Sequence, residues 1–574
     1  MADPETTARP APKRTRRKAV ATPDIAFEET RAAAPPEPKT AVVVVHGMGE
    51  QRPLETIRSF VAGVYQHDLE LANNDTDDRN MLRISIVPDT VTGSAELRRL
   101  TTQSDGPHKR TDFFEFYWAD IMDGTPVEMV TAWIDMLLLR APWRVPPAVR
   151  VFAGWLILWG LAVVVVAAAA LTAYPGLARY IPGLSRALNW FAGHHLAVAK
   201  GAYLAGALLF AWNLWHGLTT GRRRIENVRM TLPVVLMAGA VALALLPKTT
   251  LIDAHVWAGA VTALVAWFMN SLVAPYLGDV VRYVRATPST VERRRLVRER
   301  GLALLEQIHA KKLNGDDWEN FTQARANEAP YYDRIVVVGH SLGSVVAYDL
   351  VQLFWEKHGP THHQKWTAGT TPMQRALKCS DYYTRHVWVQ RRRLSDREQR
   401  AFLKRQQQLA QRLNDETPHW RITDLITLGS PLAHAAFLMT DGDGELNMAF
   451  RERRLATSPP RPDPLLQSML YPGQGPTGPL FPHFAAQFAA VKWTNICDEN
   501  PVPILGDLVS GKLQKIYGPG IVEHNVQIRR PGLIWPLNRV FTHTEYWTWD
   551  ESYRKPGGLP DYLKHLRQAL RLGQ

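Results

Sequence analysis

The sequence of 574 residues contains only two cysteines, Cys379 and Cys497. Two are too few for the disulfide framework of a small secreted protein, and they lack the paired spacing of a metal site. A reducing compartment is the simpler expectation, with a single disulfide as the open alternative. We expect neither a metal nor a cofactor.

The first 38 residues lack the apolar core that a secretory signal peptide needs. They are rich in proline, alanine and charge, which predicts a disordered basic tail over residues 1–38. The whole chain has 67 Lys and Arg against 54 Asp and Glu, a net charge of +13. Such a charge suits nucleic acid or the cytoplasmic face of a membrane, and charge alone does not choose between them.

Charged side chains are missing from three long apolar runs, residues 151–178, 201–221 and 254–278. A helix of about 20 apolar residues crosses a bilayer. A fourth run, residues 231–247, is at the short end of that range and is either a further span or a buried or re-entrant helix. We predict an inserted transmembrane domain of about four spans over residues 149–278.

Basic residues flank these runs in an alternating pattern. They precede the first run, separate the second from the third in GRRRIENVR, and follow the fourth, whereas the other two connections carry little charge. The positive-inside rule then gives four spans with both ends in the cytoplasm. No Asp, Glu, Lys or Arg lies inside any span, which disfavours a channel or transporter. We expect a multi-pass integral membrane protein with no nucleic-acid partner.

Short apolar runs outside the spans alternate with helical patterns. KTAVVVV precedes the spans, and RIVVVG, ITDLITL and VKWTNI follow them. Strands alternating with helices predict an α/β fold with a mostly parallel sheet and helices on both faces. Because an even number of spans returns the chain to the same side, we expect one domain assembled from residues 40–140 and 288–560. The basic stretch 380–420 is a helical insertion that forms a lid, contacts the membrane or is simply solvated.

The sequence GHSLG at residues 339–343 lies between a predicted strand and a predicted helix. A serine hydroxyl is a weak nucleophile that needs a general base, a group to orient the base and donors for the oxyanion. In this context Gly-x-Ser-x-Gly places the serine on a sharp, strained turn. We therefore predict that Ser341 is a nucleophile.

Backbone amides near Ser341 supply the expected oxyanion donors. One is the amide of Leu342, the residue after the serine, at the start of the helix. The other comes from the loop HGMG after the first strand, where we favour the amide of Met48, next to Gly47.

These motifs resemble the α/β-hydrolase superfamily, in particular its lipase- and esterase-like members with an HG oxyanion loop and a GHSLG turn. The chain is also similar to a bacterial membrane-inserted serine hydrolase family in HGMGEQ, FYWAD, GSPL, WTN and HTEYW. The resemblance covers roughly residues 40–120 and 330–550. It implies ester substrates, the bacterial inner membrane, and the order Ser, Asp or Glu, His along the chain.

That order leaves His543 and His524 as candidates for the base, and His543 matches the HTEYW motif of the family. For the acid we prefer Asp498, directly after a strand, with Asp507 close behind and Glu499 third. The leading hypothesis is a membrane-embedded serine hydrolase that cleaves carboxylic esters, lipids among them, on the cytoplasmic side. The alternative is a catalytically silent binding or scaffold protein with the same fold.

Overall fold

The computed structural model describes most of the predicted hydrolase domain and little of the apolar block. The described residues are 38–47, 53–68, 71, 81–89, 98–102, 109–122, 190, 193–201, 203–204, 206–208, 211, 237, 283–284, 291–311, 331–360, 371–416, 420–440, 442–473, 478–500, 505–507, 509–533, 535–540, 542–555 and 558–572. Among them, no helix combines the length and apolar character that crossing a bilayer requires. The predicted tail, residues 1–38, lies outside this set except for its last residue, and so does most of the predicted transmembrane domain.

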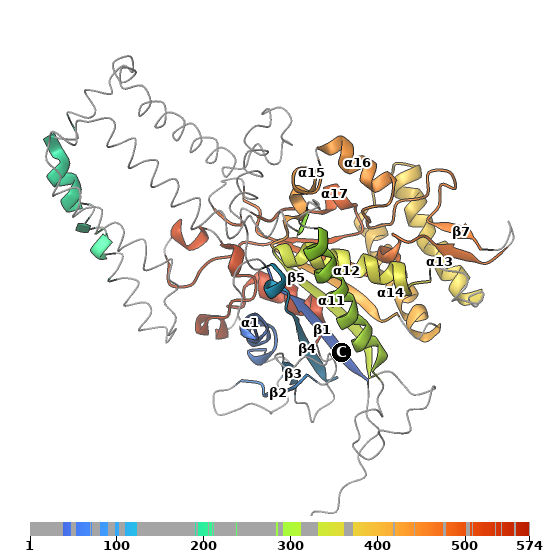
Figure 1. Ribbon diagram of the computed structural model, residues 1–574, viewed down its shortest axis with the longest axis horizontal. Helices are drawn as coiled ribbons and strands as arrows, with labels where there is room; N and C mark the ends of the chain where they lie inside the picture. Colours follow the sequence, from blue (N-terminus) through green and yellow to red (C-terminus); the bar gives the residue numbers. More distant parts are fainter. Residues whose placement is uncertain are drawn as a thin grey trace, which may run out of the picture. The chain divides into compact units, whose positions relative to one another are not determined.

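An eight-stranded, mostly parallel sheet forms the centre of this α/β fold, as predicted (Figure 1). Its strands are, in chain order, β1 (Lys39–Val45), β2 (Ile84–Pro88), β3 (Arg98–Thr102), β4 (Thr111–Phe116), β5 (Tyr332–His340), β6 (Ile422–Leu428), β9 (Lys492–Cys497) and β10 (Val522–Asn525). The spatial order is β10-β9-β6-β5-β1-β4-β3-β2. All neighbouring strands from β10 to β4 are parallel, whereas β3 is antiparallel to β4 and to β2. A separate hairpin joins β7 (Leu470–Pro472) and β8 (Leu480–Pro482).

The two centremost strands come from the two halves of the chain. β1 pairs with β5 in parallel, with Val43 opposite Val337. The valine run of β1 is buried on both faces: Val43 joins one hydrophobic cluster and Val44 the other. A β-branched run with no exposed face is typical of a central parallel strand, which explains why this run is so uniformly apolar.

Helices cover both faces of the sheet. One face carries α11 (Val291–Ala310), α12 (Leu342–His358), α13 (Thr371–Thr384) and α14 (Asp396–Glu416), and the other carries α1 (Glu55–Val61), η1 (Ala62–Gln66) and α18 (Asp561–Leu570). Other short helices in the described part of the two sequence halves are α2 (Ala119–Met122), η7 (Arg385–Val389), η8 (Pro431–His434), α15 (Ala435–Leu438), α16 (Asp443–Arg451), η9 (Gln487–Ala489), α17 (Gln514–Tyr517), η10 (Leu537–Arg539), η11 (Thr542–Thr544) and η12 (Glu551–Arg554).

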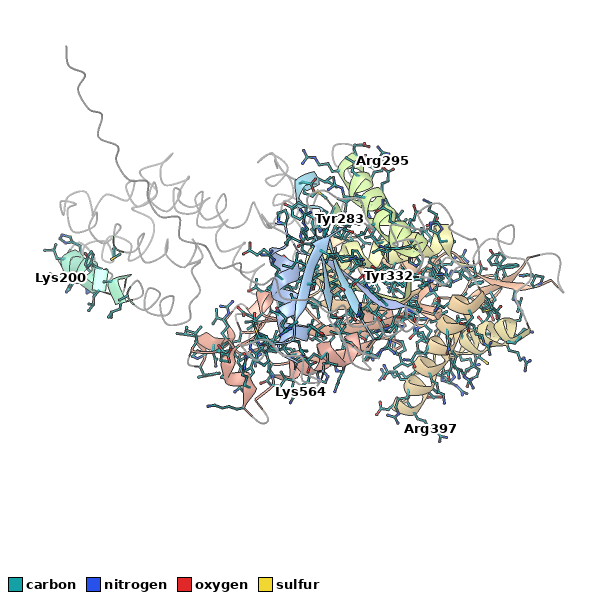
Figure 2. All side chains as sticks on the ribbon, turned by 90° about the horizontal axis from the view of Figure 1, so that it is seen from below. Lys200, Tyr283, Arg295, Tyr332, Arg397 and Lys564 are labelled. Atoms are coloured by element: carbon teal, nitrogen blue, oxygen red, sulfur yellow. The ribbon has the colours of Figure 1, made fainter. Side chains whose placement is uncertain are left out.

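The basic stretch 380–420 belongs to the layer of helices on the first face. In α14, Leu409 and Leu413 are fully buried in the core, and the Gln406 amide donates hydrogen bonds of 2.7 Å to the carbonyls of Phe488 and Val491. Figure 2 shows Arg397 on the outer end of this helix, away from the sheet. The solvated-surface alternative therefore describes one side of α14, while its apolar side completes the core.

The chain leaves and re-enters the sheet domain at neighbouring points. The rings of Trp118 and Tyr283 lie 6.4 Å apart, centroid to centroid. Arg300 of α11 forms an ion pair of 2.7 Å with Asp120 of α2. The two sequence halves thus meet where Trp118 and Asp120 of the first lie against Tyr283 and Arg300 of the second.

Candidate active site

Ser341 lies on a strained turn between β5 and α12. Its backbone has φ 54° and ψ −131°, a conformation that residues other than glycine rarely adopt. The turn is held by the Ser341 amide, which donates to the carbonyl of Leu428 on β6 (3.0 Å), and by the Ser344 amide, which donates to the Ser341 carbonyl (2.9 Å). Ser341 itself is only 2% exposed.

Small residues are required around this turn. A Cβ atom on Gly339 would come within 2.5 Å of the Ser344 Cα, and one on Gly343 would overlap the carbonyl oxygens of Val45 and His46. A Cβ on Gly47 would lie 2.8 Å from the Ser341 Cβ. Since backbone atoms cannot move aside as a flexible side chain can, the loop after β1 reaches the serine because these positions are glycines.

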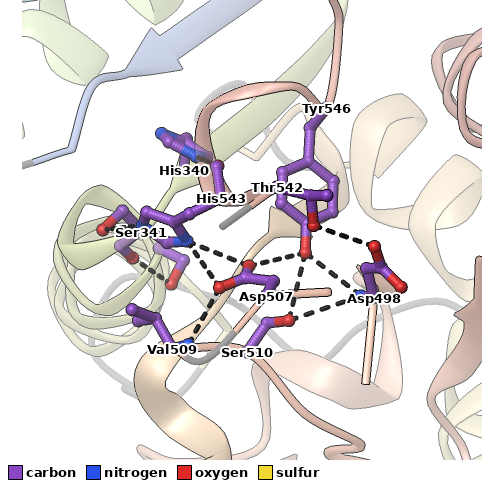
Figure 3. A network of polar contacts seen from close by, with 10 residues as sticks. His340, Ser341, Asp498, Asp507, Val509, Ser510, Thr542, His543 and Tyr546 are labelled. Atoms are coloured by element: carbon purple, nitrogen blue, oxygen red, sulfur yellow. Dashed lines mark hydrogen bonds and ion pairs between the residues drawn. The ribbon is translucent and has the colours of Figure 1, made fainter. Parts of the chain in front are cut away.

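A continuous hydrogen-bonded relay starts at Ser341 (Figure 3). The Ser341 hydroxyl lies 2.8 Å from Nε2 of His543, and Nδ1 of His543 lies 2.9 Å from each carboxylate oxygen of Asp507. With the Nδ1 proton facing Asp507, Nε2 is free to accept the serine proton. Ser341 directly follows β5, whereas Asp507 and His543 lie on the connections that follow β9 and β10.

The Asp507 carboxylate is buried and well supplied with donors. The Tyr546 hydroxyl donates to Oδ2 (2.7 Å) and the Val509 amide to Oδ1 (2.8 Å). Burial alone would raise the pKa of Asp507, but the charge interaction and hydrogen bond of His543, with those of Tyr546 and Val509, hold it well below its usual range. Asp507 therefore stays ionised beside the imidazole.

Asp498, our first choice for the acid, lies elsewhere in the network. Its Oδ1 is 2.6 Å from a guanidinium nitrogen of Arg539, and its Oδ2 accepts a hydrogen bond of 2.8 Å from the Thr542 hydroxyl. The His543 ring bonds to Asp507 instead. The geometry thus favours Asp507 over Asp498 as the acid. The chain continues beyond β9, and Asp507, nine residues after Asp498, is the carboxylate that reaches His543.

The two lesser candidates, Glu499 and His524, contact other residues. Glu499 is exposed, and its carboxylate lies 3.9 Å from the ammonium group of Lys512. His524, in β10, stacks on His565 of α18 with ring centroids 3.8 Å apart.

Two neighbouring residues that the sequence did not single out also contact the relay. Nε2 of His340 lies 2.8 Å from the carbonyl oxygen of His543, to which it donates. Burial, and then the nearby His543 ring, lower the pKa of His340 to about 3, so this imidazole is neutral. The other residue is Tyr546, whose only sequence signal was its place in HTEYW.

The predicted oxyanion donors are described in part. Leu342 is the first residue of α12 and is fully buried, directly after Ser341. Gly47 packs against the turn, whereas Met48 lies outside the described residues. His46 has a structural place, with its ring stacked on Trp118 at 5.3 Å between centroids.

The serine in LGSPL is a structural residue. The Ser430 hydroxyl oxygen accepts a hydrogen bond from the Leu432 amide (3.3 Å) and lies 2.6 Å from the Ser344 hydroxyl. The preceding Gly429 has φ 58°, and a Cβ there would lie 2.9 Å from Oδ2 of Asp507 and 3.2 Å from Nδ1 of His543. The acid and the base can meet above β6 because this position is glycine.

Within the described ranges, no group of three or more His, Cys, Asp or Glu side chains is arranged to hold a metal ion. Both cysteines are free, Cys379 exposed and Cys497 buried, so the disulfide alternative does not apply.

When the chain is compared with known proteins, no family model, no curated protein and no solved structure matches it. The motifs and the geometry of the site are therefore what points to its function.

Proposed function

We propose that the chain is a serine hydrolase that cleaves carboxylic esters through an acyl-enzyme. The observation that carries the proposal is the relay from the Ser341 hydroxyl to His543 (2.8 Å) and from His543 to Asp507 (2.9 Å). The strained turn at Ser341 and the order Ser341, Asp507, His543 along the chain give further support for an α/β-hydrolase-like enzyme.

In this mechanism the Ser341 oxygen attacks the ester carbonyl carbon as His543 takes the hydroxyl proton. Asp507 keeps His543 in the required tautomer and stabilises the imidazolium that forms. The oxyanion accepts hydrogen bonds from the amide of Leu342 and, as the sequence predicts, from that of Met48. His543 then gives its proton to the departing alcohol. A water molecule, deprotonated by His543, attacks the acyl-enzyme, and the serine leaves with that proton.

The membrane setting is the second part of the proposal. The uncharged runs within residues 149–278, the alternating basic flanks and the net charge of +13 support a multi-pass membrane protein with its site on the cytoplasmic side. The bacterial inner membrane is what the family resemblance implies. We propose a lipid ester as the substrate, because a membrane protein is surrounded by lipid. We propose no nucleic-acid partner.

One observation favours a catalytically silent binding or scaffold protein. Ser341 is only 2% exposed, so little of this residue is open to solvent. A fold can also persist after its chemistry is lost. The enzyme and the silent protein differ in the reactivity of Ser341, which can be measured directly.

A fluorophosphonate probe tests the proposal, because it reacts with serines activated by a neighbouring base. The full-length protein is expected to carry one adduct on Ser341. Ser341→Ala should abolish the adduct and His543→Ala should slow its formation at least a hundredfold, on the order of the loss of a general base. The matched control is Ser380→Ala, a buried serine of α13, which should label normally. No adduct in folded protein, or labelling unaffected by His543→Ala, would refute the enzyme.

A further inference from the structure

The acid and the base lie on two different loops, one between β9 and β10 and one after β10. A relay with 2.8–2.9 Å contacts requires the two loops to keep a fixed register. We propose that Asp498 is a positioning residue whose buried carboxylate, paired with Arg539, joins the loop of Asp507 to the loop of His543. This inference rests on the proposed hydrolase function.

Asp498 holds the acid loop through its backbone. Its carbonyl oxygen accepts a hydrogen bond of 2.9 Å from the Asp507 amide, and its own amide donates to the Tyr546 hydroxyl oxygen at 3.2 Å. Between the two aspartates the chain folds back at Gly506, which has φ 86°. A Cβ on Gly506 would lie 2.6 Å from the Asp498 carbonyl oxygen, so the acid loop closes tightly on Asp498.

The Asp498 carboxylate holds the base loop. Arg539 and Thr542, four residues and one residue before His543, contact its two oxygens at 2.6 and 2.8 Å. The base loop also pairs with the acid loop directly: the Gly506 amide donates to the Arg539 carbonyl (2.6 Å), and the Thr542 amide donates to the Gly506 carbonyl (3.1 Å). Asp498 therefore bonds to both segments of a short backbone pairing between the acid loop and the base loop, and this pairing ends next to His543.

The ion pair between Asp498 and Arg539 is buried, so the loss of either partner is costly. Asp498 is 0% exposed and the Arg539 side chain 8%. A buried ion pair need not stabilise the fold over an apolar pair, but removing one partner leaves the other charge buried without compensation. Burial raises the pKa of Asp498, while the Thr542 hydroxyl and the Arg539 charge act in the opposite direction. Since Asp498 bonds the loops and not the His543 ring, it acts through His543 and is not itself a catalytic residue.

The test is Asp498→Asn in the full-length protein, which removes the charge at nearly constant shape. The measured quantity is the rate of Ser341 labelling by a fluorophosphonate, normalised to folded protein. The matched control is Asp424→Asn, since Asp424 of β6 is equally buried and pairs with Arg334 (2.9 Å) and Arg571 (2.7 Å). Misplaced catalytic groups cost on the order of a hundredfold in rate, so Asp498→Asn should slow labelling about tenfold to a hundredfold. Asp424→Asn should stay within about twofold of the wild type, as expected for a site that does not touch the relay.

A second readout separates positioning from general damage. In the His543→Ala background, followed over longer incubation, Asp498→Asn should change the labelling rate less than about twofold, because residues that act as one unit are not additive. If Asp498→Asn does not fold, Thr542→Val replaces it. That variant should slow labelling about fivefold, the equivalent of one lost hydrogen bond.

Three results would overturn the inference: equal losses in Asp498→Asn and Asp424→Asn, full additivity with His543→Ala, or an unchanged rate in Thr542→Val. Each of them would leave the hydrolase proposal standing. A wild-type protein that forms no adduct on Ser341 would instead refute the hydrolase, and the role of Asp498 with it.

Discussion

Ser341→Gly is expected to be more stable than Ser341→Ala, the reverse of the usual order. At φ 54° and ψ −131° a residue with a Cβ carries strain of about 1–3 kcal/mol. Glycine relieves that strain but loses about 0.5–1 kcal/mol because its unfolded chain is more flexible. Both variants lose the hydrogen bond to His543, so this contribution cancels. The net advantage of glycine therefore lies between about 0 and 2.5 kcal/mol in the free energy of unfolding, with about 1 kcal/mol at mid-range.

The measurement is chemical denaturation of the purified full-length variants under identical conditions. Ser380 offers a matched pair, because it is buried within the helix α13. There, Ser380→Gly should be less stable than Ser380→Ala by about 0.8–1 kcal/mol. If Ser341→Gly is no more stable than Ser341→Ala while the Ser380 pair behaves normally, the turn is not strained.

Three further predictions concern groups around the relay and β4. Burial raises the pKa of Glu115 to about 7 from an unfolded value of 4.5, so the stability linked to this group is present below pH 4.5 and lost as the pH rises through 7. Glu115→Gln should then raise the free energy of unfolding at pH 8 by up to about 3 kcal/mol and change it little at pH 4.5; equal effects at both pH values would contradict this. Asp507→Asn should slow fluorophosphonate labelling on the order of a thousandfold or more, since His543 loses the partner that fixes its tautomer, and a loss below tenfold would argue against Asp507 as the acid. Gly429→Ala should lower the labelling rate at unchanged secondary structure by circular dichroism, because its Cβ would lie 2.8 Å from the Tyr546 ring and 2.9 Å from Asp507, and a wild-type rate would show that these groups can move aside.

Local sequence predicted the centre of the fold well. The valine run of β1 and the glycines around Ser341 act through burial and backbone shape, which the sequence pattern reveals directly. The preference for Asp498 over Asp507 as the acid differs from the observed geometry. Which of the two carboxylates reaches His543 depends on how two loops pair around Gly506, and the pattern of residues along the sequence does not reveal such a pairing. The apolar side of α14 was likewise hidden by its many charges. His543 was found through the resemblance of HTEYW and not through spacing.

The neighbouring exit and re-entry points at Trp118 and Tyr283 bear on how freely this chain can vary. For a flexible connection, joining two fixed points with about 160 residues in place of 10 costs only about 2.5 kcal/mol more in chain entropy. The length of an insertion at this point therefore matters little to the sheet, provided that both ends return to the ring pair. For a membrane insertion of the kind we propose, that condition requires an even number of spans, so parity and not length decides whether β1 and β5 still meet.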